Sequence, residues 1–188
     1  DVGGRRGSCA LTRIRPPGSM MAEAPVSLNE NAAWYEKDRV DFLEDSEEFV
    51  VGRLAAAAAA ANLETGHEQE AEWTSSVRLM RDDALQERVQ TVRGALREVE
   101  EIRHVILEYD FRRRGLRMDA ILVAPGVLFV VEFKRARPTA ADRDQAMAYA
   151  VNLLEFHRVT RAWAGAGTRI VPIVVQTDPE RSRAPLPD

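Results

Sequence analysis

The clearest pattern in the sequence is a pair of apolar runs separated by a two-residue turn. The runs cover Arg117–Ala124 and Val127–Phe133, and Pro125-Gly126 lies between them. β-Branched and large apolar residues on both sides of turn-forming residues predict a β-hairpin. Proline cannot take the positive φ that the favoured two-residue hairpin turns require at its position. A type II turn with Gly126 third, or a register shifted by one residue, therefore stays open.

The register of this hairpin decides which polar side chains meet. If Ala124 faces Val127 across the turn, counting back along both strands places Asp119 directly opposite Glu132. Two facing carboxylates repel, so the pair needs a compensating cation or a raised pKa. A hard divalent ion between oxygen ligands is one solution. Lys134 lies two residues after Glu132, on the same face of its strand. The pattern predicts an acid–acid–lysine site, which a register shift would separate.

Other apolar runs predict further strands. Val127–Val131 is apolar at five consecutive positions, which is typical of a strand covered on both faces. We predict that His104–Phe111 is the first strand and Arg169–Gln176 the last. Pro172 cannot donate to a ladder, so the last strand should lie at a sheet edge. The order strand, helix, strand predicts a parallel crossover next to the hairpin.

Helical spacing of apolar residues predicts helices on both sides of the hairpin. A short helix is expected over Trp34–Leu43, and a second from Ser46 through Ala61. Glu68–Val99 predicts one long helix or two consecutive ones. After the hairpin, Thr139 or Ala140 begins a helix that runs to Phe156.

Composition and charge limit the domain organisation and the kind of partner. The 188 residues hold one α/β domain, which we place at 67–177, with an N-terminal helical annex at 28–66. Residues 1–27 are rich in Gly, Pro and Arg and are predicted to be disordered, and 178–188 to form a linker or tail. The net charge of −4 argues against a globally basic nucleic-acid coat, so any such binding needs a local patch.

Cysteine usage and hydropathy suggest a cytoplasmic protein without a membrane partner. Cys9 is the single cysteine, which excludes an internal disulfide and fits a reducing compartment. No apolar run reaches membrane-spanning length.

Basic residues also carry information. Only two of the 26 basic residues are lysines, Lys37 and Lys134, so a chain that otherwise uses arginine has a compact ammonium at the predicted site. A basic cluster precedes the hairpin and consists of Arg112, Arg113, Arg114 and Arg117. Arginine suits phosphate, yet charge at a turn is commonly solvated, so phosphate contact and a solvated turn remain alternatives.

The hairpin motif resembles the metal-binding signature of the PD-(D/E)xK nuclease superfamily. Asp119 is followed by Glu132-Phe133-Lys134 at the end of the next strand, and Met118-Asp119 stands in place of Pro-Asp. Gln145 and Tyr149, in the sequence DQAMAYA, resemble the QxxxY element of RecB-like members. The two elements together are more specific than the carboxylate–lysine motif alone.

A longer stretch, from about Trp34 to Thr177, resembles the N-terminal domain of uncharacterised bacterial proteins in which a nuclease-like domain precedes a Schlafen-type P-loop helicase. The matching pieces are WYEKDRVDFL, VGRLA, RRRGLRMDAILV, VLFVVEFK, DQAMAYAVNLLEFH and IVPIVVQT. No P-loop motif (GxxxxGK followed by Ser or Thr) occurs in this chain. The resemblance therefore implies a helicase or ATPase partner outside it.

The resemblance also implies a fold, an activity and a set of roles. The fold would be a restriction endonuclease-like α-β-β-β-α-β core with a mixed sheet and an N-terminal helical annex. The activity would be Mg²⁺- or Mn²⁺-dependent hydrolysis of phosphodiester bonds in nucleic acid, with DNA favoured over RNA and both substrates left open. Asp119, Glu132 and the main-chain carbonyl of Phe133 would bind the ion. Lys134 would steady the attacking water or the developing charge, while Gln145 and Tyr149 would position substrate.

Alternatives accompany each of these roles. Tyr149 could be a core residue with Gln145 at its edge. Glu70 and Glu72 are candidates for a further acidic ligand on a helix, but a solvated helix face explains them as well. At the level of function, the alternatives are a catalytically inactive nuclease-fold domain that binds nucleic acid or regulates a helicase partner, and an ordinary α/β scaffold with a coincidental motif.

Overall fold

The protein is described by a computed structural model that covers residues 33–64, 75–111 and 114–178 of the chain. Several predictions fall outside these ranges. They concern the extension at 1–27, the tail from 179 onward, and the side chains of Glu70, Glu72, Arg112 and Arg113.

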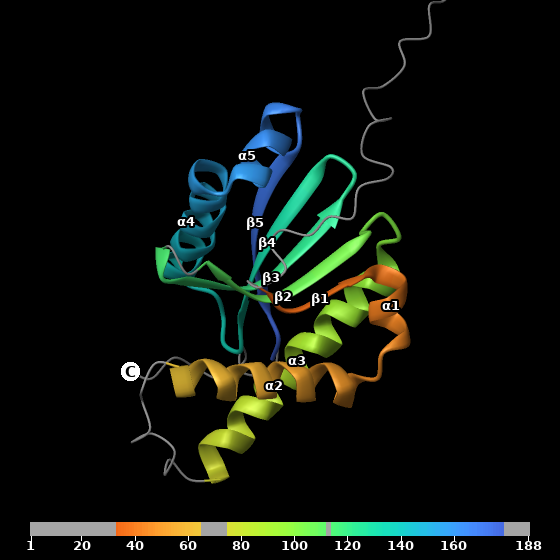
Figure 1. The fold of residues 1–188 in the computed structure, drawn as a ribbon. Coiled ribbons are helices and arrows are strands. Elements are labelled where there is room, and N and C mark those ends of the chain that lie inside the picture. The colour runs from red at the N-terminus through yellow and green to blue at the C-terminus, as the bar shows by residue number, and fades with distance from the viewer. Residues whose placement is uncertain (1–32, 65–74, 112–113, 179–188) are drawn as a thin grey trace, which may run out of the picture.

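The centre of the fold is a mixed five-stranded sheet whose strands lie side by side in sequence order (Figure 1). Its strands are β1 (Ala33–Asp38), β2 (His104–Phe111), β3 (Leu116–Ala124), β4 (Val127–Lys134) and β5 (Arg169–Gln176). Strands β1 to β4 pair antiparallel, and β5 pairs parallel to β4. The predicted mixed α/β class is confirmed, as are the parallel crossover and the edge position of the strand that contains Pro172.

The predicted hairpin forms with the unshifted register. Ala124 pairs with Val127, and the ladder continues in step to Ala120 and Val131. Gly126 has φ 73°, which a type II turn requires of its third residue and which glycine adopts without steric cost. Strand β4 lies between β3 and β5 and is buried over most of its length, as its continuous apolar run predicts.

The prediction of a helix over Trp34–Leu43 is wrong for its first half. Ala33–Asp38 is strand β1, and only Arg39–Glu44 is helical (α1). As a result, His104–Phe111 is the second strand of the sheet and not the first. β1 is held by partners far away in the chain, since Tyr35 pairs with Leu107. A local apolar pattern carries no information on such a partner, and tertiary pairing overrides the local preference.

The remaining helices are α2 (Glu47–Glu64), α3 (Ser75–Glu98), α4 (Ala140–Phe156) and α5 (Arg158–Gly165). α4 begins as predicted, because Thr139 is its N-cap and forms a reciprocal capping box with Asp142. α5 was not predicted; the side chain of His157 caps its N-terminus by accepting from the Thr160 N–H. Among the described residues, no helix combines the length and the apolar character needed to cross a membrane.

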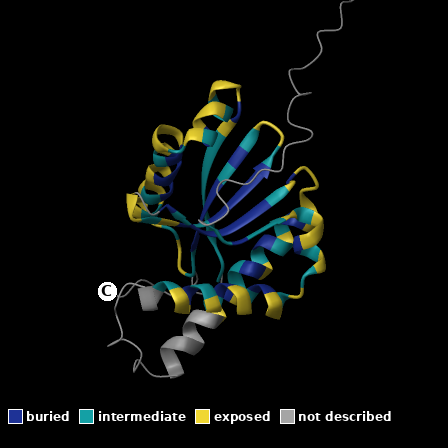
Figure 2. Ribbon diagram, in the orientation of Figure 1, coloured by how far each residue is buried: buried dark blue, intermediate teal, exposed yellow. Residues whose placement is uncertain are grey.

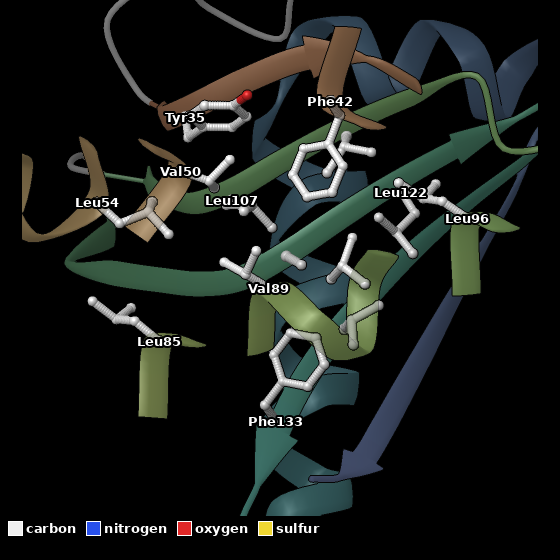
Figure 3. Close-up of a cluster of buried hydrophobic side chains, with 14 of the residues drawn as sticks. Tyr35, Phe42, Val50, Leu54, Leu85, Val89, Leu96, Leu107, Leu122 and Phe133 are labelled. Atoms are coloured by element: carbon white, nitrogen blue, oxygen red, sulfur yellow. The ribbon is translucent and has the colours of Figure 1, made fainter. Parts of the chain in front are cut away.

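Helices cover both faces of the sheet, so the fold has three layers with a buried sheet in the middle (Figures 1 and 2). α1, α2 and α3 pack on one face, and α4 and α5 on the other. The first core, shown in Figure 3, is centred on Phe42, Val89 and Leu107. The second contains Tyr109, Met118 and apolar residues of α4.

The alternation of side chains between the two cores breaks at one level of the sheet. Along β2 it breaks at Glu108, and along β3 it breaks at Asp119. These two residues occupy facing positions, one step beyond the Leu107–Ala120 pair. Glu108 has φ 51°, in the left-handed region that a glutamate rarely adopts, and this backbone turn reverses the order of the side chains that follow. Two carboxylates therefore lie where both strands change faces.

Candidate functional site

The site lies where the ladder between β3 and β4 ends. Ala120 and Val131 form the last pair of the ladder, and beyond it the Asp119 Oδ2 accepts a hydrogen bond from the Phe133 N–H at 2.8 Å. The carboxylate thus takes the place of the next main-chain acceptor. This contact holds Asp119 beside the end of β4, where the sequence predicted that it would meet Glu132 and Lys134.

Glu132 is the buried acid of the site. The residue is only 5% exposed, and its Oε1 pairs with the Lys134 Nζ at 3.0 Å. Oε2 is buried and has no hydrogen-bond partner among the described residues. Burial raises the pKa of the Glu132 carboxyl, the charge of Asp119 raises it further, and Lys134 and Arg88 oppose both effects. The site therefore has an oxygen acceptor that no described residue satisfies.

Lys134 is a fixed ammonium surrounded by oxygen atoms. Besides Glu132, its Nζ contacts Asp142 Oδ1 at 3.1 Å and donates to Gln145 Oε1 at 3.3 Å. Burial alone would lower the pKa of Lys134, but the hydrogen bonds to Glu132 and Asp142 outweigh it and raise the pKa. The side chain therefore stays protonated and can donate, but it cannot act as a base near neutral pH.

Gln145 and Tyr149 share one face of α4, as predicted, and continue this network. The Gln145 Nε2 donates to the Tyr149 hydroxyl at 2.6 Å. Tyr149 is 8% exposed and its ring belongs to the second core. Its pKa is raised, first by burial and then by the charges of Glu132 and Asp119, so the hydroxyl keeps its proton. The core alternative for Tyr149 is correct for the ring, while the hydroxyl end lies in the polar network.

Three charged residues at the site were missed by sequence reasoning: Asp142, which contacts Lys134, and Arg88 and Glu108. Arg88 Nη1, from α3, lies 2.6 Å from Glu108 Oε1 and 2.9 Å from Asp119 Oδ1. Glu108 is 3% exposed, and its other oxygen pairs with Arg117 Nε at 3.0 Å. Burial raises the pKa of Glu108, an effect that the two arginines oppose. A signal existed, because Glu108 directly follows the apolar residues Val105–Leu107 in a predicted strand, where a buried acid is rare.

Two of the four arginines predicted to bind substrate, Arg114 and Arg117, are among the described residues, and both contact other side chains of the protein. Arg114 donates to Asn152 Oδ1 at 2.9 Å and lies over the Phe156 ring at 4.3 Å. Arg117 pairs with Glu108 and lies over the Trp34 ring at 4.8 Å. The phosphate contact of this cluster stays a prediction.

The donor set can be compared with what a divalent ion requires. Among the described residues, no group of three or more His, Cys, Asp or Glu side chains is arranged to hold a metal ion. Mg²⁺, however, is usually bound by one or two carboxylates and keeps several waters. Asp119 and Glu132 are two such carboxylates, and the unsatisfied Glu132 Oε2 is an oxygen that a cation would satisfy. The residues present therefore fit a hydrated Mg²⁺ or Mn²⁺, but not an all-protein cage.

No family model, no curated protein and no solved structure matches the chain. The fold class is a three-layer α/β arrangement around a mixed sheet. The function therefore has to be argued from the chemistry of the site.

Proposed function

We propose that this chain is a metal-dependent nuclease domain of the PD-(D/E)xK type, which hydrolyses phosphodiester bonds in nucleic acid with Mg²⁺ or Mn²⁺. Asp119, Glu132 and the main-chain carbonyl of Phe133 would hold the ion. DNA is the proposed substrate, and a helicase or ATPase the proposed partner.

One observation carries the proposal. The buried Glu132 Oε2 has no hydrogen-bond partner among the described residues, and it belongs to a carboxylate that another carboxylate destabilises. A buried, unsatisfied and repelled oxygen costs free energy, about 1–3 kcal/mol for a neutral group and more for a charged one. A site that keeps such an atom beside a lysine and a Gln–Tyr pair is better explained by a bound cation than by stability.

The side chains divide the work of the proposed reaction. The bound ion would supply charge neutralisation at the phosphate and activation of the attacking water. Lys134, protonated and partly exposed, donates to the oxygen on which charge develops. Gln145 orients the Lys134 ammonium and is itself fixed by the Tyr149 hydroxyl. The Tyr149 hydroxyl proton remains available to a substrate oxygen.

A second function is favoured by a specific observation. Asp119 is already paired with Arg88, and Glu132 with Lys134, so both proposed ligands are neutralised by the protein itself. A domain neutralised in this way could have lost its ion and kept the fold. It would bind nucleic acid, or regulate a helicase partner, without cleavage.

A cleavage assay separates the two functions. The purified chain is incubated with single-stranded and duplex DNA and RNA, with Mg²⁺, with Mn²⁺ and with chelator. We expect ion-dependent cleavage that Lys134→Met lowers by roughly 10²–10³, because a charge-stabilising donor is lost, while Mn²⁺ binding is kept. Glu132→Gln should remove both cleavage and binding.

Lys37 provides a matched control, since it is the second lysine and forms only a partly exposed pair with Asp45 at 3.7 Å. Lys37→Met should cleave like wild type. If wild type binds nucleic acid but cuts none of the substrates with either ion, the inactive-domain function replaces the nuclease.

A further inference from the structure

The position of Arg88 has a consequence beyond the proposed reaction. A single nitrogen, Nη1, lies within hydrogen-bond distance of one oxygen of Glu108 and one oxygen of Asp119. The Asp119 oxygen is Oδ1, while Oδ2 is engaged by the Phe133 N–H. Oδ2 is thus held by the main chain, and Oδ1 is the Asp119 oxygen whose partner is a positively charged side chain.

Glu108 provides a second anchor for the same guanidinium. Its carboxylate is almost fully buried, and the shorter of the two Arg88 contacts is the one to Glu108, at 2.6 Å against 2.9 Å for Asp119. Holding an acid here is unfavourable, because the carboxylate is desolvated and the backbone takes a left-handed φ. If Arg88 moves off Asp119, it keeps a charged partner.

We propose that Arg88 is a built-in counter-cation that competes with the divalent ion for Asp119. In the ion-free protein the guanidinium bridges Glu108 and Asp119 and relieves their repulsion. An ion bound at Asp119 would displace the guanidinium from that carboxylate and leave Arg88 paired with Glu108. This positioning role rests on the proposed metal site, and it sets the ion concentration at which that site fills.

Removal of Arg88 should change the affinity for the ion in opposite directions, depending on whether Arg88 competes with the ion or only orients Asp119. If Arg88 only orients Asp119, its removal disorders the ligand and weakens ion binding. If Arg88 competes, its removal frees Oδ1 and takes one repelling positive charge out of the site. Losing a charge-assisted hydrogen bond to the competing group should then lower the Kd for the ion about tenfold or more.

The test is isothermal titration of the whole chain with Mn²⁺ for wild type, Arg88→Met and a control. Arg135→Met is a suitable control because Arg135 pairs at 2.6 Å with Glu87, the residue next to Arg88 on α3. We expect tighter Mn²⁺ binding for Arg88→Met and an unchanged Kd for Arg135→Met. The double variant Arg88→Met/Glu108→Gln removes the buried acid together with its partner, so it keeps the test open if the single variant does not fold.

The outcomes distinguish this inference from the proposed function. If wild type binds Mn²⁺ and Arg88→Met binds it equally or more weakly, competition is refuted while the metal site stands. If wild type binds none and Arg88→Met does, Arg88 blocks the site, which supports competition and overturns ion-dependent activity for the native chain. If neither variant nor wild type binds Mn²⁺, both proposals fail.

Discussion

The proposed metal site predicts that Mg²⁺ or Mn²⁺ raises the thermal stability of the protein. A ligand that binds only the folded protein stabilises it by about 2.7 kcal/mol when its concentration is a hundred times Kd. For a chain of this size, about 1 kcal/mol corresponds to a Tm shift of about 2–4 °C. Saturating Mg²⁺ or Mn²⁺ should therefore raise the Tm of wild type by roughly 5–10 °C.

Glu132→Gln separates this shift from any general effect of salt. The substitution relieves the destabilised buried acid but also loses its ion pair with Lys134, which keeps its contact with Asp142; the two effects oppose each other, so the ion-free variant should melt close to wild type. It should, however, show no Tm shift with either ion. The assay is differential scanning calorimetry with chelator, with Mg²⁺ and with Mn²⁺ at constant ionic strength. Melting curves of wild type that stay as unresponsive as those of Glu132→Gln would refute the metal site.

Three further predictions concern the site and its scaffold. Lys134→Arg keeps the charge but replaces a compact ammonium with a bulky fork, so cleavage should fall by at least tenfold, about 1.4 kcal/mol; wild-type cleavage would reduce Lys134 to electrostatic background. Burial alone would lower the pKa of His104, but hydrogen bonds to two carboxylates of β1 raise it above 6.5. The stabilisation by His104 is thus complete below that pH and is lost as the pH rises through the pKa of the folded state. In urea unfolding, the free energy of unfolding of wild type should therefore exceed that of His104→Gln by a larger margin at about pH 6 than at about pH 8.5. Phe42→Ala, at a side chain with 0% exposure, should cost about 3–5 kcal/mol in urea unfolding, whereas Phe49→Ala, 51% exposed, should cost far less.

The parts of the fold that sequence could predict depend on near neighbours. The turn at Pro125-Gly126 joins two strands directly, so turn chemistry and apolar runs predicted the hairpin and offered the β3–β4 register that forms, while a shift by one residue stayed open. Strand β5 was predicted with its exact bounds, because a continuous apolar run and Pro172 are both local signals. The side chains of Glu132, Lys134, Gln145 and Tyr149 came together because a strand end and the next helix start are close in the chain.

The parts that sequence could not predict depend on distant partners or on backbone conformation. Strand β1 is short and contains several charged residues, so its sequence does not favour a strand by itself. It is extended because it pairs with the edge of β2, about seventy residues later in the chain. Arg88 sits on a helix whose apolar spacing says nothing about what its polar face reaches. The left-handed φ of Glu108 has no local signature in HVILEYDF, since glutamate is not a residue that favours it.

The order of strands in the sheet also bears on how the chain folds. β2, β3 and β4 follow one another in sequence and space, so their pairing closes only short loops. β1 and β5 must each join this meander across a longer segment, which costs more loop entropy before any contact compensates for it. We therefore expect the meander to form in the folding transition state, with the two outer strands docking later. Substitutions on β1 or β5 would then mainly speed unfolding, whereas those in the meander, which carries Glu108, Asp119 and Glu132, would slow folding itself.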